Sequence, residues 1–153
     1  DAVGSAARSL SRFGVSSFLL FNYSDLGLTP AYAGTPLEPA ARAATAAYNA
    51  AISDVADGLR RDGFGVREID AAALFAQAVS DPASLGFTNV TEACLTATAF
   101  CGDAEGYLWF DAVHPTARAH ALIANRVAPV PLPASALLLL CGFAGLAALR
   151  RAA

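Results

Sequence analysis

The sequence contains no lysine and no methionine, and only 15% of its 153 residues are charged. All basic side chains are therefore arginines, and they form no basic cluster within residues 1–128. Together with a formal net charge of −3, this argues against nucleic-acid binding. The hydrophobic fraction of 56% is too high for a disordered chain. The first residues do not have the pattern that is expected of a secretory signal peptide.

Cysteine is scarce, with three residues in the chain. Cys94 and Cys101 lie in one segment rich in threonine, glycine and aspartate. In an exported protein these two could form a local disulfide, and the alternative is two free thiols. A zinc site is not expected, because two cysteines without suitably spaced histidines do not make a ligand set. Cys141 lies in an apolar tail and is interpreted as a small hydrophobic residue.

Apolar periodicity predicts helices and strands in alternation. Helices are expected at 1–13, 40–62, 71–79 and 115–127, and short strands at 15–21 and 65–69. The run at 15–21 is typical of a buried strand in a parallel sheet. The segment from 81 to 110 is expected to be a long functional loop. The longest helix should bury a stripe formed by Ala44, Tyr48, Ile52, Val55 and Leu59.

Polar side chains follow the first predicted strand. Asn22, Tyr23 and Asp25 stand directly after it. In α/β enzymes, ligands bind beyond the carboxyl ends of the strands, so these residues are candidates for lining a cleft. The alternative is that Asn22 and Asp25 only cap a turn.

The strongest chemical pattern is Asp111-x-x-His114, followed by Pro115. A histidine held by a nearby carboxylate is the base-and-orienter part of a nucleophilic hydrolase. The aromatic run at 107–110 should bury the aspartate, and Pro115 suits the first turn of a helix. Taken in isolation, a motif of this kind is more often an ordinary loop-to-helix junction. His120 is interpreted as a packed or hydrogen-bonded structural residue.

Three segments, in order, resemble the GDSL/SGNH family of serine esterases and lipases. They are Phe21–Pro30, Gly86–Cys94 and Tyr107–His120, and the last resembles the family's final block, D-x-x-H-P-T. The resemblance implies an α/β fold, namely the C-terminal portion of a three-layer α/β/α sandwich with a parallel sheet. It also implies an ester substrate and no cofactor, with His114 as general base and Asp111 as its orienting acid.

The family's Gly-Asp-Ser block, which carries the nucleophile, has no counterpart in this sequence, and neither does its G-x-N-D block. We therefore expect residues 1–128 to be the C-terminal part of a longer hydrolase domain, inactive without the serine. The rival hypothesis is a non-catalytic surface or extracellular-matrix protein with a decayed hydrolase domain.

The tail is a separate unit. A proline-rich linker at 129–133 precedes an apolar segment at 134–151 that ends in an arginine pair, and its length suits a transmembrane helix. The string Val130-Pro131-Leu132-Pro133-Ala134 resembles the VPLPA form of PEP-CTERM sorting tails. That resemblance implies an exported protein, held at the inner membrane of a Gram-negative cell until an exosortase-type enzyme cleaves it. Its C-terminus would face the cytoplasm before cleavage. A plain C-terminal anchor is the alternative.

Overall fold

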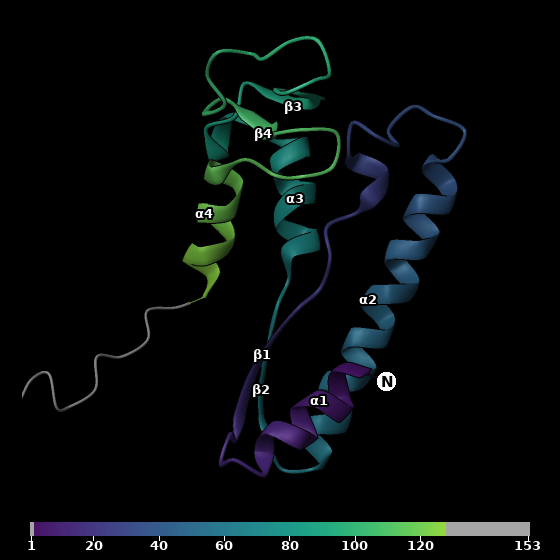
Figure 1. The fold of residues 1–153 in the computed structure, drawn as a ribbon, viewed down its shortest axis with the longest axis vertical. Helices are drawn as coiled ribbons and strands as arrows, with labels where there is room; N and C mark the ends of the chain where they lie inside the picture. Colours follow the sequence, from purple (N-terminus) through teal and green to yellow (C-terminus); the bar gives the residue numbers. More distant parts are fainter. Residues whose placement is uncertain (1, 128–153) are drawn as a thin grey trace, which may run out of the picture.

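The computed structural model describes residues 2–127 (Figure 1). The predicted linker at 129–133 and the predicted transmembrane segment at 134–151 lie outside this range. Within residues 2–127, no helix combines the length and the apolar character needed to cross a membrane. The helices and strands are α1 Ala2–Ser11, β1 Ser17–Phe21, η1 Leu26–Leu28, α2 Glu38–Arg61, β2 Gly65–Ile69, α3 Ala71–Ser80, η2 Ala83–Leu85, β3 Asn89–Ala93, β4 Tyr107–Trp109 and α4 Ala117–Arg126.

The first strand pair is β1 with β2, which run parallel with Ser17 opposite Gly65 and Phe21 opposite Ile69. The long helix α2 connects the strands and packs against both, and α1 packs against α2. The parallel pairing confirms the prediction for this segment. The prediction that the strand is buried is wrong for one of its faces. Leu19 and Phe21 are 44% and 41% exposed, because no further described element covers that side of β1.

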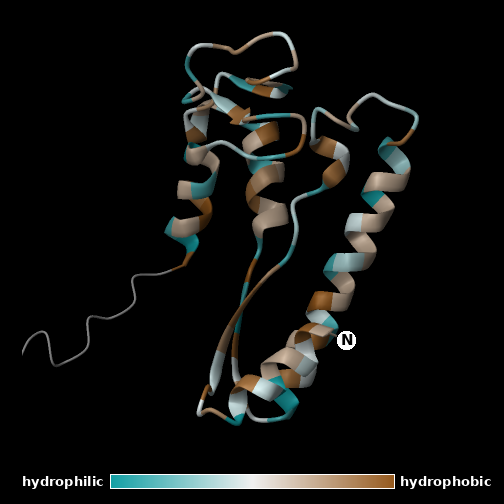
Figure 2. Cartoon of the chain, in the orientation of Figure 1, coloured by the Kyte–Doolittle hydropathy of each residue, from teal (hydrophilic) through white to brown (hydrophobic). Residues whose placement is uncertain are grey.

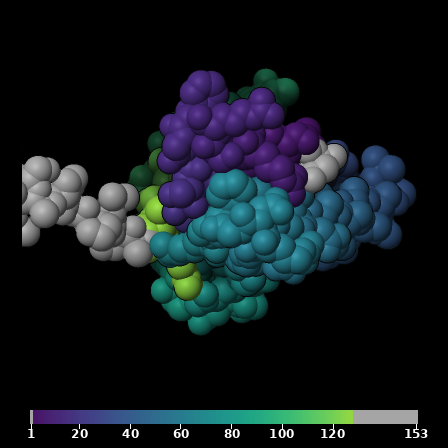
Figure 3. All heavy atoms as spheres, turned by 90° about the horizontal axis from the view of Figure 1, so that it is seen from below, coloured from purple at the N-terminus to yellow at the C-terminus, as the bar shows by residue number. Residues whose placement is uncertain are grey.

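The N-terminal helix α1 is held against the end of α2. Arg8 donates from Nε to Oδ2 of Asp62 at 2.8 Å. A space-filling view from below shows the N-terminal segment lying directly on the chain around residue 60 (Figure 3). This contact fixes the turn into β2, since Asp62 caps α2 just before that strand begins.

The apolar stripe predicted for α2 is only partly correct. Ile52 and Leu59 are buried as expected, whereas Ala44 and Tyr48 are exposed. The face that packs inward instead consists of Ala41, Thr45, Ile52, Ala56 and Leu59. Thr45 can be buried there because its hydroxyl donates to the carbonyl of Ala41 and accepts from the backbone N–H of Leu26.

The second strand pair, β3 with β4, corrects the prediction of one long loop from 81 to 110. These strands are also parallel and lie at the other end of α3 from β1 and β2 (Figure 1). Among the described residues, the two pairs do not join into a single sheet. The result is an α/β domain with parallel pairing in two separate places.

A compact core supports this second pair. The mostly apolar helix α3 packs on β3, and α4 packs on β4 (Figure 2). The buried cluster consists of Phe75, Ala78, Phe87, Leu108, Trp109 and Ala119. The Trp109 indole N–H donates to the carbonyl of Val90, so the largest core side chain also ties β4 to β3. This core lies directly beneath the loop that carries Asp111 and His114.

Candidate functional site

Asp111 and His114 form a direct side-chain pair. Nδ1 of His114 lies 2.8 Å from Oδ2 and 3.0 Å from Oδ1 of Asp111. When Nδ1 keeps its proton and donates it in a hydrogen bond to the carboxylate, Nε2 carries the free lone pair. The pair therefore has the arrangement of a general base with its orienting acid. The histidine side chain is 73% exposed.

The Asp111 carboxylate is held in its ionised form. Its Oδ1 accepts backbone hydrogen bonds from Val113 at 2.9 Å and from His114 at 2.7 Å. These two N–H groups, with the smaller contribution of the His114 ring, lower the pKa of Asp111 to about 2. At neutral pH the carboxylate is thus available to stabilise an imidazolium.

The expectation that the aromatic run buries Asp111 needs correction. Leu108 and Trp109 are fully buried, but Phe110 turns outward and the Asp111 side chain remains 33% exposed. The cause is the end of β4 at Trp109, after which the chain leaves the core and turns at the surface. Asp111 is consequently held by backbone hydrogen bonds more than by an apolar pocket.

The loop between β4 and α4 closes on itself. Phe110 N–H donates to the carbonyl of His114 at 2.7 Å, and Trp109 forms an antiparallel bridge with Pro115. Pro115 and His114 therefore precede α4, contrary to the prediction that the helix opens there. Thr116 is the N-cap, accepting from the backbone N–H of Ala119.

Thr116 contributes a second anchor that the sequence analysis missed. It is buried, its hydroxyl donates to the carbonyl of Tyr107 at 2.8 Å, and its N–H donates to the carbonyl of Leu108 at 3.0 Å. These bonds fasten the end of the loop to the strand that begins it. A threonine directly before a helical pattern is an N-cap signal, so the residue could have been found from the sequence.

Cys94 and Cys101 are joined by a disulfide, with Cα atoms 4.8 Å apart. Cys94 is buried, and its N–H donates to the carbonyl of Trp109 at 3.1 Å. The bridged loop is therefore attached to the strand that delivers Asp111. Among residues 2–127, no group of three or more histidine, cysteine or acidic side chains is arranged to hold a metal.

Asn22 fastens the end of β1 to the start of α3. Its Nδ2 donates to Oδ1 of Asp70 at 2.7 Å, and its Oδ1 accepts from the N–H of Ala72 at 3.0 Å. The Asn22 amide, followed by the Ala73 N–H, lowers the pKa of Asp70. Asn22 thus acts locally as a capping residue.

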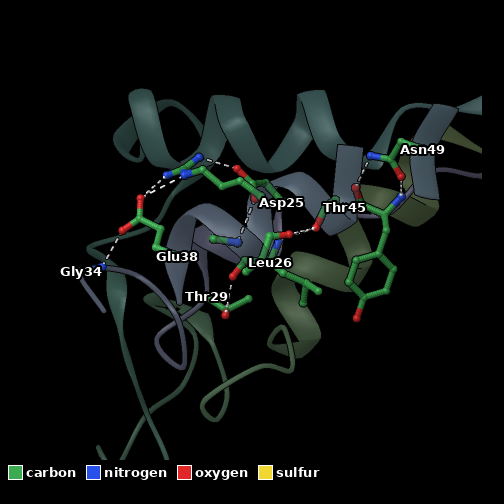
Figure 4. Close-up of polar contacts among 11 residues, drawn as sticks. Asp25, Leu26, Thr29, Gly34, Glu38, Thr45 and Asn49 are labelled. Carbon is green, nitrogen blue, oxygen red and sulfur yellow. Dashed lines mark hydrogen bonds and ion pairs between the residues drawn. The ribbon is translucent and has the colours of Figure 1, made fainter. Parts of the chain in front are cut away.

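Asp25 belongs to a charged network around Arg42 (Figure 4). Its carboxylate accepts from the N–H of Gly27 and pairs with the Arg42 guanidinium, which also binds Glu38. The Gly34 N–H, then Arg42, lower the pKa of Glu38. The network holds η1 and its flanking loop against the start of α2.

The three candidate cleft residues do not share one surface. Asn22 and Asp25 line a shallow depression beside α3, whereas Tyr23 lines an apolar one with Tyr48, whose ring lies edge-on at 6.3 Å. Asp111 and His114 line neither depression. A backbone hydrogen bond from the N–H of Ala31 to the carbonyl of Ala112, at 2.9 Å, connects the loop after η1 to the loop that carries Asp111 and His114.

His120 was predicted to be a packed or hydrogen-bonded structural residue. It lies on α4 with its side chain exposed, so it is not packed. It occupies the outer face of the helix, while Ala119 beside it points into the core. Its position makes it a convenient control for experiments on His114.

Comparison with known proteins decides the family. The family model of the GDSL-like lipase/acylhydrolases matches residues 1–127. The chain belongs to this family. No individual curated protein matches it. For the GDSL-like domain, the paired Asp111 and His114 are the described residues whose geometry suits the family's hydrolytic chemistry.

Proposed function

We propose that this GDSL-like domain supplies the general base and the orienting acid of an ester hydrolase. The observation that carries the proposal is the contact between His114 Nδ1 and an Asp111 carboxylate whose pKa lies near 2. Membership of the lipase/acylhydrolase family supports ester hydrolysis as the reaction class. No step of this chemistry requires a metal or an organic cofactor.

In the proposed reaction, Nε2 of His114 accepts the hydroxyl proton of a serine as its oxygen attacks the ester carbonyl. The imidazolium that forms is stabilised by Asp111 through Nδ1–H. His114 then gives its proton to the departing alkoxide, which leaves as an alcohol and gives an acyl-enzyme. Water, deprotonated by the same histidine, releases the acid and restores the serine.

Residues 1–153 include no Gly-Asp-Ser block, the segment that the family resemblance gives as the carrier of the nucleophile. We infer that the chain by itself does not hydrolyse esters, and that the active enzyme includes a serine from outside this sequence. The same absence favours a second candidate, a non-catalytic surface or extracellular-matrix protein that retains only the scaffold.

We further propose that the protein is exported and held at the inner membrane by residues 134–151, with the globular part in the periplasm. Val130-Pro131-Leu132-Pro133-Ala134 would be the recognition motif of an exosortase-type processing enzyme. The apolar run followed by Arg150 and Arg151 supports this orientation. A disulfide in the globular part is compatible with an oxidising compartment.

The experiment that separates the two candidates is active-site labelling of the protein expressed from its whole gene. A fluorophosphonate reacts with a serine that a histidine has activated, so the enzyme hypothesis predicts one labelled serine. His114→Ala should abolish labelling, and His120→Ala should leave it unchanged. Absence of labelling in the unsubstituted protein would instead support the non-catalytic candidate.

A further inference from the structure

The peptide groups of Phe110 connect two parts of the site. Its N–H donates to the carbonyl of His114 at 2.7 Å, and its carbonyl accepts from the N–H of Leu95 at 2.7 Å. Asp111 follows directly, so the position of its carboxylate depends on how Phe110 is held. The N–H of Phe110 is held by His114, and its carbonyl is held by Leu95, the residue after Cys94.

The segment that holds Phe110 is closed by the disulfide. Cys101 N–H donates to the carbonyl of Cys94 at 2.8 Å, and Leu95 bridges Phe100 across the loop. The turn inside is tightened by Thr96, whose N–H donates to the carbonyl of Ala99 and whose hydroxyl accepts from the same residue. The N–H groups of Cys94 and Leu95 are therefore held in place, and they donate to the carbonyls of Trp109 and Phe110.

We propose that the Cys94–Cys101 disulfide positions Asp111 for its work on His114, so that reduction of this bond by a small dithiol disengages the pair. This inference rests on the proposed function of Asp111 and His114. In the reduction, the dithiol gives two electrons and two protons. The S–S bond breaks to two thiols, and the reductant closes to its own disulfide.

The effect reaches Asp111 through the backbone. Reduction leaves Cys94 and Cys101 free to separate, which removes the constraint on Leu95 and weakens its bond to the Phe110 carbonyl. The turn from Asp111 to His114 then loses one of its supports and opens more often. Each opening separates the carboxylate from the N–H groups of Val113 and His114, which are the first causes of its low pKa.

The test is an NMR titration of the Asp111 carboxyl carbon in the full chain carrying Cys141→Ser, which prevents mispairing. The oxidised protein should titrate at about 2. After treatment with dithiothreitol, and in a Cys101→Ser variant, the midpoint should rise toward the ordinary value of 3.8. Cys101 is exposed, so its replacement creates no cavity. Reoxidation of the reduced protein should restore the low midpoint.

The matched control is Ala56→Gly in α2, which destabilises a buried position far along the chain without touching the loop. Its Asp111 midpoint should stay near 2, because loss of stability alone does not move the contacts of Asp111. A midpoint unchanged on reduction and in Cys101→Ser would overturn the inference. An ordinary midpoint in the oxidised protein would instead remove the geometric basis of the proposed function.

Discussion

At neutral pH the Asp111 carboxylate keeps its charge at the protein surface because the chain folds back on it. The N–H groups of Val113 and His114 both point at Oδ1, and the His114 ring approaches Oδ2. One carboxylate therefore has three roles: it caps the turn, orients the imidazole and offsets the charge of the imidazolium. Substitution here should affect stability and function together.

Asp111 should give the protein a measurable pH dependence of stability. Its pKa is lowered from 3.8 to about 2 on folding, so its stabilisation is present above about pH 4 and is lost as the pH falls through 2. The free energy of unfolding of the native chain should therefore exceed that of Asp111→Asn at pH 7, and the difference should shrink toward pH 2. Urea unfolding at several pH values measures it. If the stability difference between the native chain and Asp111→Asn stayed constant from pH 7 to pH 2, the lowered pKa of Asp111 would be contradicted.

At the scale of elements, the site is built by β4, the loop after it and the start of α4. Thr116 joins all three, since its hydroxyl bonds both the carbonyl of Tyr107 and the N–H of Ala119. The helix thus cannot shift along its axis without disturbing β4. This explains how an exposed histidine can have a defined position.

Replacement of Thr116 by valine should lower the free energy of unfolding by about 1–2 kcal/mol, because the partly buried carbonyl of Tyr107 and the helix N–H of Ala119 lose their partner. Thr116→Ser keeps the hydroxyl and should cost clearly less. Denaturant unfolding followed by the fluorescence of Trp109, the only tryptophan, gives both values. Equal losses in the two variants would show that the methyl group, and not the cap, is what the site requires.

Local sequence patterns were sufficient for some elements and not for others. The strand at 65–69 and the helix after it were predicted closely, because glycine and Asp70 mark their starts. β3 and β4 were missed, since Asn89 and Glu92 interrupt any apolar alternation and β4 is only Tyr107–Trp109. Their pairing depends on the core under Trp109, which is a tertiary contact that no local pattern reports.

For the candidate site, too, the sequence predicted one part and not the other. Asp111 and His114 follow from their spacing, because a turn that joins them is short. The exposure of Tyr48 and the separation of Tyr23 from Asn22 and Asp25 could not be predicted, since they depend on how η1 lies against α2. The Arg42 network that sets this arrangement links residues distant in the sequence.

For the whole molecule, the missing serine block predicts a clear negative result. A purified chain of residues 1–153 should show no turnover of a short-chain aryl ester above the buffer rate, because the family's Gly-Asp-Ser block, which carries the nucleophile, does not occur in it. The assay needs His114→Ala as its control. Turnover that disappears in that variant would mean that the chain contains its own nucleophile.

The tail gives a second prediction at this scale. Residues 134–149 carry no charge and precede Arg150, so the C-terminus should stay in the cytoplasm. Alkaline phosphatase, which is active only after export, should be inactive when fused after Ala153 and active when fused after Val127 in an exported protein. Activity in both fusions would rule out the proposed membrane topology.

The most direct measurement of the central claim is kcat for ester hydrolysis by the protein expressed from its whole gene, with Asp111 and His114 substituted one at a time. His114→Ala and Asp111→Asn should each lower kcat by on the order of 10³–10⁴, because one removes the base and the other its correct tautomer. His120→Ala should stay within about twofold, as an exposed helix position remote from this pairing does. Retention of most of the kcat by His114→Ala would contradict the account.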